Sequence, residues 1–262
     1  MLGNGTNHEN ISSEHSLKIS VISDIHVNPD FSGGLDILRK FCRNQKVRDS
    51  DVVVFLGDIF DLMVYDFDSY LDIYSEALEE IRGLTDHGAH IYFVEGNHDF
   101  NIRSVLEKSL GREQFFYFSE GLNLNISDKI FSFHHGDSIE IENYFYKIYR
   151  YIIKSRFLKN VYKYLVGFDH TWSFGNFLLG RSHERHLKYS NNYDSEKVKR
   201  KFRVSAQKFF FENKTSSFLI CGHSHIKDNY VFDGKRYLNN GFAQKEKTFL
   251  YFNGNEFEFV SL

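Results

Sequence analysis

Five short segments carry Asp, His and Asn side chains at spacings that suit metal binding. The segments are Asp24-Ile25-His26, Gly57-Asp58-Ile59-Phe60-Asp61, Gly96-Asn97-His98-Asp99, His134-His135-Gly136-Asp137 and Gly222-His223-Ser224-His225. Oxygen and imidazole ligands without thiolates favour Mn²⁺, Fe²⁺, Co²⁺ or Zn²⁺. Two such ions can share a bridging carboxylate, lower the pKa of a water and neutralise phosphate oxygens. The segments therefore predict a two-metal centre that hydrolyses a phosphate ester or phosphoanhydride.

A structural explanation competes with metal binding for each segment taken alone, because a buried Asp or His is often a hydrogen-bonded core residue. The five segments together favour the metal centre. So many unpaired carboxylates and imidazoles in one core would cost on the order of several kcal/mol per group. Four of the histidines outside the segments are expected at the surface: His8, His15, His87 and His90.

An apolar, β-rich run precedes each of the five segments. The runs cover residues 17–23, 51–56, 90–95, 129–133 and 217–221. The continuous apolar run at 52–56 predicts a strand buried on both faces. Helical patterns at 35–43 and 69–84 separate the first three runs, so βαβ units and a largely parallel sheet are expected. In such sheets, ligands collect at the carboxyl ends of the strands.

The last forty residues predict antiparallel hairpins. The turn sequences Asp233-Gly234 and Asn253-Gly254-Asn255 separate β-rich runs within 230–237 and 249–260. The expected fold is a mixed α/β sandwich in which helices cover two packed sheets. We expect a single domain over residues 17–262, after a flexible N-terminal head of residues 1–16.

A basic insertion of about residues 138–205 separates the fourth and fifth runs and is too long for a simple connection. From Glu140 to Lys208 the chain has 15 Lys and Arg residues and 6 Asp and Glu residues, a balance of +9, against −3 for the whole chain. Apolar residues recur at helical spacing from Phe145 to Val166. They predict a basic amphipathic helix or helix pair that packs on the core, lies in a membrane interface or covers an apolar substrate. The positive charge either forms a solvated face or meets an anionic lipid surface, nucleotide or nucleic acid.

The cysteine content and hydropathy predict a cytoplasmic location. Cys42 and Cys221 are far apart and show no metal or redox spacing, which is typical of buried thiols in a reducing compartment. No apolar run reaches the 18 or more residues of a spanning helix, and the first sixteen residues lack the apolar region of a signal peptide.

The ordered segments resemble the calcineurin-like metallophosphoesterase superfamily, from about residue 17 to the C-terminus. The resemblance implies an α/β/β/α sandwich of two mixed sheets with two divalent ions at the strand ends, Mn²⁺ being the first expectation. It implies that the first ion binds Asp24, His26 and His225 and that Asp58 bridges both ions. The second ion would bind Asn97, His135 and His223, and His135 is preferred to His134 because the family's ligand directly precedes Gly-Asp.

Neighbouring residues of the segments are expected to assist the metal ligands. His98 would stand near the phosphate as a charge stabiliser or general acid, and the neutral oxygen of Asn97 limits the negative charge that faces an anionic substrate. Asp61, Asp99 and Asp137 would orient imidazoles or loop amides, or would be turn or cap residues.

A closer resemblance is to the UDP-2,3-diacylglucosamine pyrophosphohydrolase family of lipid A synthesis. It is carried by residues 56–61, by residues 96–100 and by His135-Gly136-Asp137-Ser138, which leads into a long aromatic-rich insertion. The best-known members have Arg where this chain has His98. The resemblance implies a nucleotide-sugar lipid substrate split to UMP, a helical cap over the acyl chains, and a peripheral position on the cytoplasmic face of the inner membrane. Three cations of the insertion are candidates for phosphate contacts: Arg181, Arg185 and Lys188.

Two other function classes remain open. A relative acting on a soluble nucleotide, phosphoprotein or nucleic acid would share the metal centre and differ in the cap. A nuclease would bind nucleic acid with a steep salt dependence, and no stable nucleic-acid partner is expected here. A non-catalytic metal-dependent scaffold would bind metal without turning over activated phosphodiesters.

Overall fold

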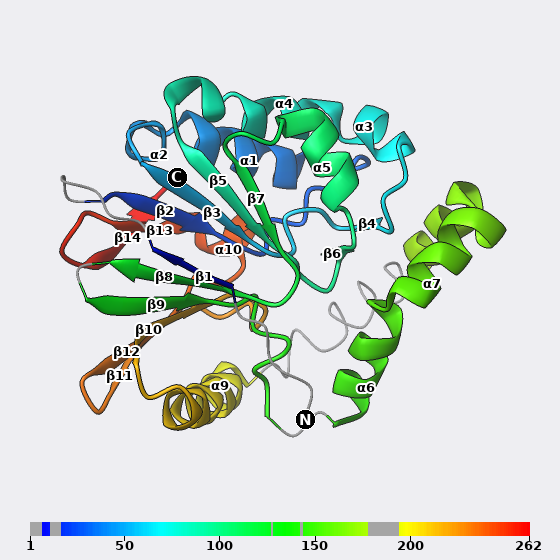
Figure 1. Ribbon diagram of the computed structural model, residues 1–262. Coiled ribbons are helices and arrows are strands. Elements are labelled where there is room, and N and C mark those ends of the chain that lie inside the picture. Colours follow the sequence, from blue (N-terminus) through cyan, green and yellow to red (C-terminus); the bar gives the residue numbers. More distant parts are fainter. Residues whose placement is uncertain (1–6, 11–16, 127, 142–143, 178–193) are drawn as a thin grey trace.

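Two six-stranded β-sheets pack face to face, and helices cover the outer surface of each sheet (Figure 1). The computed structural model describes residues 7–10, 17–126, 128–141, 144–177 and 194–262. This arrangement is the expected α/β/β/α sandwich. A small third sheet joins β4 (Met63–Val64) to β6 (Asp99–Phe100) beside the strand ends.

The first sheet is mainly parallel, and it contains three of the five predicted strands. Its order is β14 (Phe257–Ser261), β13 (Thr248–Phe252), β2 (Ile19–Ile22), β3 (Val52–Leu56), β5 (His90–Val94) and β7 (Phe115–Phe118). Strands β2, β3, β5 and β7 run parallel, whereas β13 is antiparallel to both β2 and β14. The carboxyl ends of β2, β3 and β5 therefore meet at one edge.

The second sheet brings the other two predicted strands to that edge. Its order is β1 (Asn7–Asn10), β8 (Leu122–Ile126), β9 (Lys129–Phe133), β10 (Ser216–Cys221), β12 (Lys235–Asn239) and β11 (Asp228–Phe232). Strands β9 and β10 are parallel neighbours, so the segments that follow them emerge together. Strand β1 lies within the head that the sequence predicts to be flexible, and it pairs with β8.

Alternation along β3 explains the layers. Val52, Val54 and Leu56 enter the core between the sheets, while Val53 and Phe55 belong to the core under the helices. Successive side chains of a strand point to opposite faces, so a strand that is apolar throughout must be covered on both. The prediction from the continuous apolar run is confirmed.

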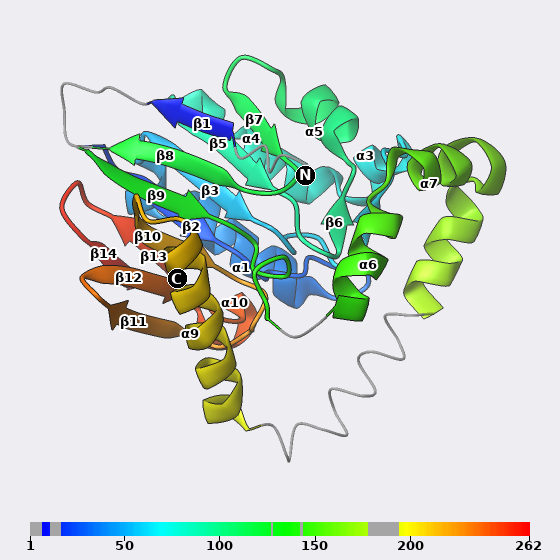
Figure 2. The ribbon, with the colours of Figure 1, turned by 60° about the horizontal axis from the view of Figure 1, so that its bottom comes forward.

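Helices of the outer layers bury one apolar face each. Helices α1 (Ser32–Arg43), α4 (Ser75–Arg82) and α5 (Arg103–Leu110) cover the first sheet, and α9 (Ser195–Glu212) covers the second (Figures 1 and 2). The shorter helices are α2 (Gln45–Arg48), α3 (Ser69–Ile73), η1 (Thr85–His87) and α10 (Ala243–Glu246). On α9, Phe202, Ala206 and Phe210 pack against β10 and β12. The predicted insertion of about 138–205 therefore overlaps a helix of the sandwich itself.

The predicted strands and both predicted hairpins are confirmed, and one predicted helix is wrong in detail. The pattern at 69–84 is two helices, α3 and α4, which meet at Tyr74 outside helical geometry (φ −109°, ψ 21°). The buried Tyr74 hydroxyl donates a hydrogen bond to the carbonyl oxygen of Leu62 (2.9 Å), a contact with another segment that periodicity cannot reveal.

The insertion forms a string of helices beside the sandwich (Figures 1 and 2). It contains α6 (Tyr144–Ile153), α7 (Arg156–Val161), the π-helical turn η2 (Tyr162–Val166) and a helical segment at 168–177. Its apolar side chains are largely exposed, whereas Arg150 and Lys154 are turned inward and paired with carboxylates. Four apolar residues of the insertion nevertheless pack on the core under the helices: Ile153, Tyr162, Phe168 and Trp172. Packing on the protein's own core therefore accounts for part of the apolar side, and the rest is exposed.

Phe131→Ala should destabilise the fold by about 3–5 kcal/mol, because it empties a site between the sheets. The Phe131 ring stacks on the Phe218 ring, with centroids 4.5 Å apart, and meets the Phe252 ring edge to face, with centroids 5.1 Å apart. Urea unfolding followed by circular dichroism measures the change. Phe211→Ala is the matched control, since that ring is 77% exposed on α9, and should shift stability by less than about 0.5 kcal/mol. Equal losses in both variants would contradict the assigned core.

Candidate metal centre

The loops after β2, β3, β5, β9 and β10 converge at one edge of the sandwich. Among the described residues, three groups of side chains place potential ligand atoms within 4.8 Å of one another. One group is Asp24, His26, Asp58 and His225, and another is Asp58, His135 and His223. The two groups share Asp58. The structure thus brings six of the seven predicted ligands into two adjoining sites.

The first site joins side chains from both sheets. His225 Nε2 lies 3.4 Å from Asp24 Oδ1 and 3.3 Å from His26 Nε2, and His26 Nε2 lies 3.8 Å from Asp58 Oδ2. Asp24 is fully buried and accepts hydrogen bonds from the backbone N–H of His223 (3.0 and 3.1 Å). This bond fixes the loop after β10 against the loop after β2.

The second site includes the seventh predicted ligand. His135 Nε2 lies 3.4 Å from Asp58 Oδ2 and 3.1 Å from Asn97 Oδ1. The His223 ring lies beside the His135 ring, with centroids 5.1 Å apart. Asp58 is therefore placed between the two groups, as expected of a bridging carboxylate.

The imidazole tautomers test whether a cation fits these sites. His135 Nδ1 lies 3.0 Å from the carbonyl oxygen of Leu56, and His26 Nδ1 lies 3.2 Å from Asp61 Oδ1, so both Nδ1 atoms act as donors. Each Nε2 then faces carboxylate oxygen, amide oxygen or another imidazole nitrogen, so it must carry a proton or donate its lone pair to a metal ion. Converging lone pairs repel unless a positive charge lies among them. The donor set fits a pair of divalent ions.

The electrostatics of the cluster point the same way. Burial alone would raise the pKa of Asp58, but the charges of His135, His98 and His26 hold it well below its usual value. Burial alone would lower the pKa of His135, but the charges of Asp58 and Asp24 raise it to about 10. The buried carboxylates thus create a negative potential that attracts positive charge.

Asp61 and His98 lie where the sequence prediction expects assisting residues. Asp61 accepts hydrogen bonds from the His26 ring and from the Asn28 side chain (2.8 Å), which fixes the His26 ring orientation. His98 Nδ1 lies 2.8 Å from the carbonyl oxygen of Asp61, and the His98 ring contacts the His26 ring at 4.8 Å. His26, Asp61 and His98 form the third group of potential ligands. We favour an orienting role for Asp61, since its carboxylate faces His26 Nδ1 and the first site faces Nε2.

Asp99 organises backbone amides. Its carboxylate accepts hydrogen bonds from the N–H groups of Asp58, Ile59, Phe60 and Gly96, at 2.7–3.2 Å. Burial raises the pKa of Asp99 to about 7, and the charge of Asp58 adds to the shift. Asp99 therefore holds the loop of Asp58 against the loop of Asn97.

Asp137 is bound differently from the expectation. Its Oδ2 accepts hydrogen bonds from Arg150 Nε (2.7 Å) and the Tyr146 hydroxyl (3.3 Å), both on α6. Burial alone would raise its pKa, but Lys154, Arg150 and His135 hold the pKa of Asp137 far below its usual value. The described hydrogen bonds thus join Asp137 to the insertion rather than to an imidazole or a loop amide.

The two adjacent histidines have different surroundings. His135 belongs to the cluster, whereas His134 Nδ1 lies 3.3 Å from the carbonyl oxygen of Glu120 and the His134 ring contacts Phe209 of α9. Burial lowers the pKa of His134 to about 4, so that ring stays neutral.

Sequence reasoning missed several residues that contact the predicted ligands. The Phe242 ring stacks on the His225 ring at 5.2 Å, and Glu140 Oε2 lies 3.9 Å from His223 Nε2. Phe242 follows β12, a sixth strand end at the same edge, and its loop Asn239-Asn240-Gly241 resembles the other strand-end loops. That pattern could have indicated that the loop after β12 also reaches the metal centre. No spacing rule would have found Glu140.

Two glycines allow the loops to approach each other. A Cβ atom on Gly96 would lie 2.2 Å from Asp58 Oδ1, and a Cβ atom on Gly57 would lie 2.6 Å from His135 Nδ1. Gly57 also has a positive φ of 77°. Any larger residue at either position would displace a predicted ligand, which explains both glycines of the motifs.

The backbone is left-handed at five of the seven predicted ligands. The φ angles lie between 52° and 64° at Asp24, His26, Asp58, His223 and His225. Such angles are uncommon for residues other than glycine, although Asp, Asn and His adopt them more readily than most. Unfavourable backbone angles concentrated at one place are typical of functional sites.

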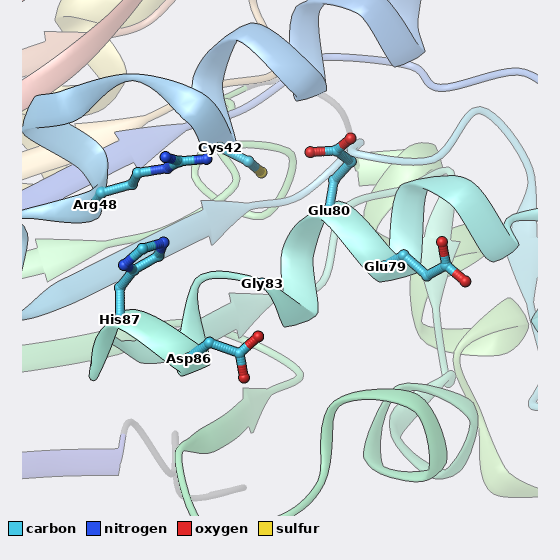
Figure 3. A pocket seen from close by; sticks show the side chains of 7 residues that line it. All are labelled: Cys42, Arg48, Glu79, Glu80, Gly83, Asp86 and His87. Atoms are coloured by element: carbon cyan, nitrogen blue, oxygen red, sulfur yellow. The ribbon is translucent and has the colours of Figure 1, made fainter.

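A separate hollow of about 290 Å³ lies away from the metal centre, on the helical layer of the first sheet (Figure 3). It is lined by Cys42, Arg48, Glu79, Glu80, Gly83, Asp86 and His87, none of which belongs to the five motifs. Glu80 is paired with Arg43 and Arg39. This hollow therefore has no part in the chemistry described above.

Asp58→Asn should abolish the two-ion site. The amide can keep the left-handed backbone and the hydrogen bonds to Asn97 N and His98 N, but it removes the shared negative charge. We expect fewer than two bound Mn²⁺ per chain by elemental analysis, and more than about a 100-fold loss of phosphodiester turnover. Asp233→Asn, at an exposed turn with the same backbone geometry (φ 51°), is the control. Two ions and full turnover in Asp58→Asn would contradict the bridging role.

The chain is similar in sequence to known hydrolases that share one name. The UDP-2,3-diacylglucosamine hydrolase of Neisseria gonorrhoeae is 30% identical over 141 residues, 54% of this chain and 57% of that protein. The chain thus matches little more than half the length of that relative. The enzyme of the same name from Wigglesworthia glossinidia brevipalpis is 22% identical over 219 residues, 82% of each chain.

A solved archaeal phosphodiesterase structure has a TM-score of 0.49 at 14% identity, covering 94% of this chain and 100% of that one. The calcineurin-like phosphoesterase family matches residues 17–227, which include all five motifs. This match covers well over half of the chain and confirms the resemblance seen in the sequence. The chain belongs to the calcineurin-like phosphoesterase family.

Proposed function

We propose that this protein is a two-metal hydrolase that splits the pyrophosphate of UDP-2,3-diacylglucosamine to UMP and 2,3-diacylglucosamine 1-phosphate. The observation that carries the phosphoesterase chemistry is the pair of ligand groups that share Asp58. The substrate is suggested by the names of the relatives and by the apolar insertion beside the site.

The proposed ligand assignment follows the two groups. Asp24, His26 and His225 would hold the first ion, and Asp58 would bridge. The second ion would bind Asn97 Oδ1 and the imidazoles of His135 and His223. Two divalent ions, Mn²⁺ by preference with Fe²⁺, Co²⁺ or Zn²⁺ as alternatives, would supply Lewis acidity and activate water.

The chain's own residues would prepare the site for an anionic substrate. Asp61 and the Leu56 carbonyl oxygen fix two imidazole tautomers, so the ligand nitrogens are oriented before substrate arrives. Asn97 contributes an oxygen without charge. His98 is partly exposed at the edge of the cluster, with its Nδ1 held by the Asp61 carbonyl, and we assign to it stabilisation of phosphate charge or protonation of the leaving group.

The lipid part of the substrate is argued from the insertion. Ten large apolar side chains between residues 145 and 177 are exposed, and we call them the apolar surface: Phe145, Ile148, Tyr149, Tyr151, Ile152, Phe157, Tyr164, Leu165, Phe174 and Phe177. Exposed apolar surface of this extent is unusual for a protein surrounded by water and indicates a binding or membrane surface. Its attachment to Asp137 sets it next to the metal centre.

We propose a peripheral position at the cytoplasmic face of the inner membrane, with the apolar surface in contact with lipid. In the described part of the chain, the helices are too short or too polar to cross a bilayer. The basic side chains contribute less to lipid contact than the sequence suggested. Arg150, Lys154 and Lys159 pair with carboxylates of the sandwich, while Lys147 and Arg156 are exposed. Arg181, Arg185 and Lys188, proposed for phosphate contact, lie outside the described residues.

The proposed substrate is tested by Mn²⁺-dependent release of UMP from UDP-2,3-diacylglucosamine in detergent micelles. Hydrolysis of bis-p-nitrophenyl phosphate is measured on the same preparation. We expect efficient UMP release and slow diester turnover. Diester turnover without UMP release would keep the phosphoesterase chemistry and overturn the lipid substrate in favour of a soluble one. Metal binding with neither activity would favour the scaffold.

Phe157→Glu should weaken binding to anionic liposomes by roughly 10-fold or more, because it places a charge in the apolar surface, where the ring is 74% exposed. Phe211→Glu on α9 is the matched control, because its ring is 77% exposed outside the insertion. Sedimentation with vesicles measures binding, and bis-p-nitrophenyl phosphate hydrolysis should be unchanged in both. Equal vesicle binding by Phe157→Glu and the unmodified chain would argue against membrane contact through this surface.

A further inference from the structure

Two buried cations on the last turn of helix α6 face the sandwich rather than solvent: Arg150 lies within the helix, and Lys154 is the residue after it, with its N–H bonded to the Arg150 carbonyl oxygen (3.0 Å). Arg150 Nε lies 2.7 Å from Asp137 Oδ2, and Lys154 Nζ lies 3.2 Å from Glu95 Oε2. The two cationic side chains are 11% and 9% exposed, and the carboxylates are 1% and 2% exposed. Arg150 and Lys154 are four residues apart, so they lie on the same face of the helix. Charges removed from water to this extent require their partners.

Each buried carboxylate lies two residues from a predicted ligand of the second ion. Asp137 follows His135 by two residues, and Glu95 precedes Asn97 by two. These two ligands come from different sheets, and their ligand atoms are 3.1 Å apart. The face of α6 that carries the two cations thus spans the gap between the loops that must bring His135 and Asn97 together.

Other contacts fix α6 at this place. The Tyr65 hydroxyl donates to the carbonyl oxygen of Ile153 (3.0 Å), and Asn101 Nδ2 donates to that of Lys154 (3.1 Å). Glu95 Oε1 accepts a hydrogen bond from Asn101 N (2.8 Å). The end of α6 is therefore held against the loop that follows Asn97, and the helix acts as a rigid support rather than as a loosely attached cap.

The Lys154 contact depends on charge alone. Its Nζ is buried and makes no hydrogen bond within the described residues, so the ammonium is balanced by the nearby carboxylates and lies over the Phe100 ring at 5.5 Å. Without that charge, Glu95 would be a buried carboxylate held by hydrogen bonds from the Tyr117 hydroxyl and Asn101 N but by no cation. The loop can relieve this by moving, by admitting water or by taking up a proton. Movement or water entry would shift the chain at Glu95, two residues before Asn97.

We propose that Arg150 and Lys154 are positioning residues for the second metal ion, acting through Asp137 and Glu95 on His135 and Asn97. The inference rests on the proposed two-metal centre and assigns the insertion a role beyond substrate or membrane contact. In this role, the docked helix α6 is a condition for a complete second site, while the first site depends only on loops of the sandwich.

Lys154→Met tests the inference, because it keeps the length of the side chain and removes its charge. Mn²⁺ binding is measured by calorimetry, and occupancy of both sites by the exchange-coupled signal of paired Mn²⁺ in electron paramagnetic resonance. We expect a 10- to 100-fold loss of affinity for one ion and unchanged affinity for the other. The double variant Lys154→Met/Glu95→Gln should recover most of the loss, since no unpaired charge is left. Lys147→Met, exposed on the same helix, should bind like the unmodified chain.

The outcomes separate this inference from the proposed metal centre. If the unmodified chain binds fewer than two ions, the two-metal proposal and the inference both fail. If it binds two, and Lys154→Met binds both with unchanged affinity, only the inference fails. A lower melting temperature with unchanged Mn²⁺ affinity would assign Lys154 to structure alone and also overturn it. If Lys154→Met does not fold, Arg150→Lys, which keeps the charge and loses the Nε contact, should show the same selective loss.

Discussion

The interaction on which the structure depends is the burial of carboxylates at the ends of parallel strands. Asp24, Asp58 and Asp99 are essentially inaccessible to solvent. Asp24 and Asp58 belong to one ligand group, and Asp99 accepts a hydrogen bond from Asp58 N. Backbone N–H groups and imidazoles satisfy part of this charge, and the remainder requires cations. The glycines that allow close approach and the bonds that fix imidazole tautomers serve this one requirement. The fold brings negative charge to a place where protonated imidazoles or bound cations can balance it, and the proposed phosphate chemistry would use such cations.

Much of this arrangement is predictable from sequence because it follows from strand ends. An apolar run that stops just before Asp24 or Asp58 predicts a strand, and it also predicts that the Asp side chain lies at the carboxyl edge of the sheet. The ligands could therefore be grouped from the sequence before their distances were known. Contacts between distant segments could not be predicted. The helical pattern is interrupted at Tyr74, whose hydroxyl donates a hydrogen bond to another loop, and Phe242 contacts His225 only because β12 has joined the second sheet.

The insertion shows why charge and hydropathy patterns do not determine how a helix is oriented on the protein. Its sequence is amphipathic, but such a pattern does not say which face meets the protein. Here Arg150 and Lys154 turn inward and form ion pairs with buried carboxylates, and rings such as Phe145 and Phe157 are exposed. The excess of positive charge in this part of the chain is thus partly neutralised inside the molecule, which a count of charged residues cannot show.

The left-handed backbone at the ligands has a consequence for evolution and engineering. At His223 and His225, glycine would relieve an unfavourable conformation. In a descendant that no longer needs metal, glycine at these positions would relieve backbone strain, at the cost of contacts such as those of the His225 ring with Asp24 and Phe242. Selection for activity, not for folding, must hold the histidines in place. Loss of ligands in a relative with this fold would accordingly signal a changed function rather than a damaged scaffold.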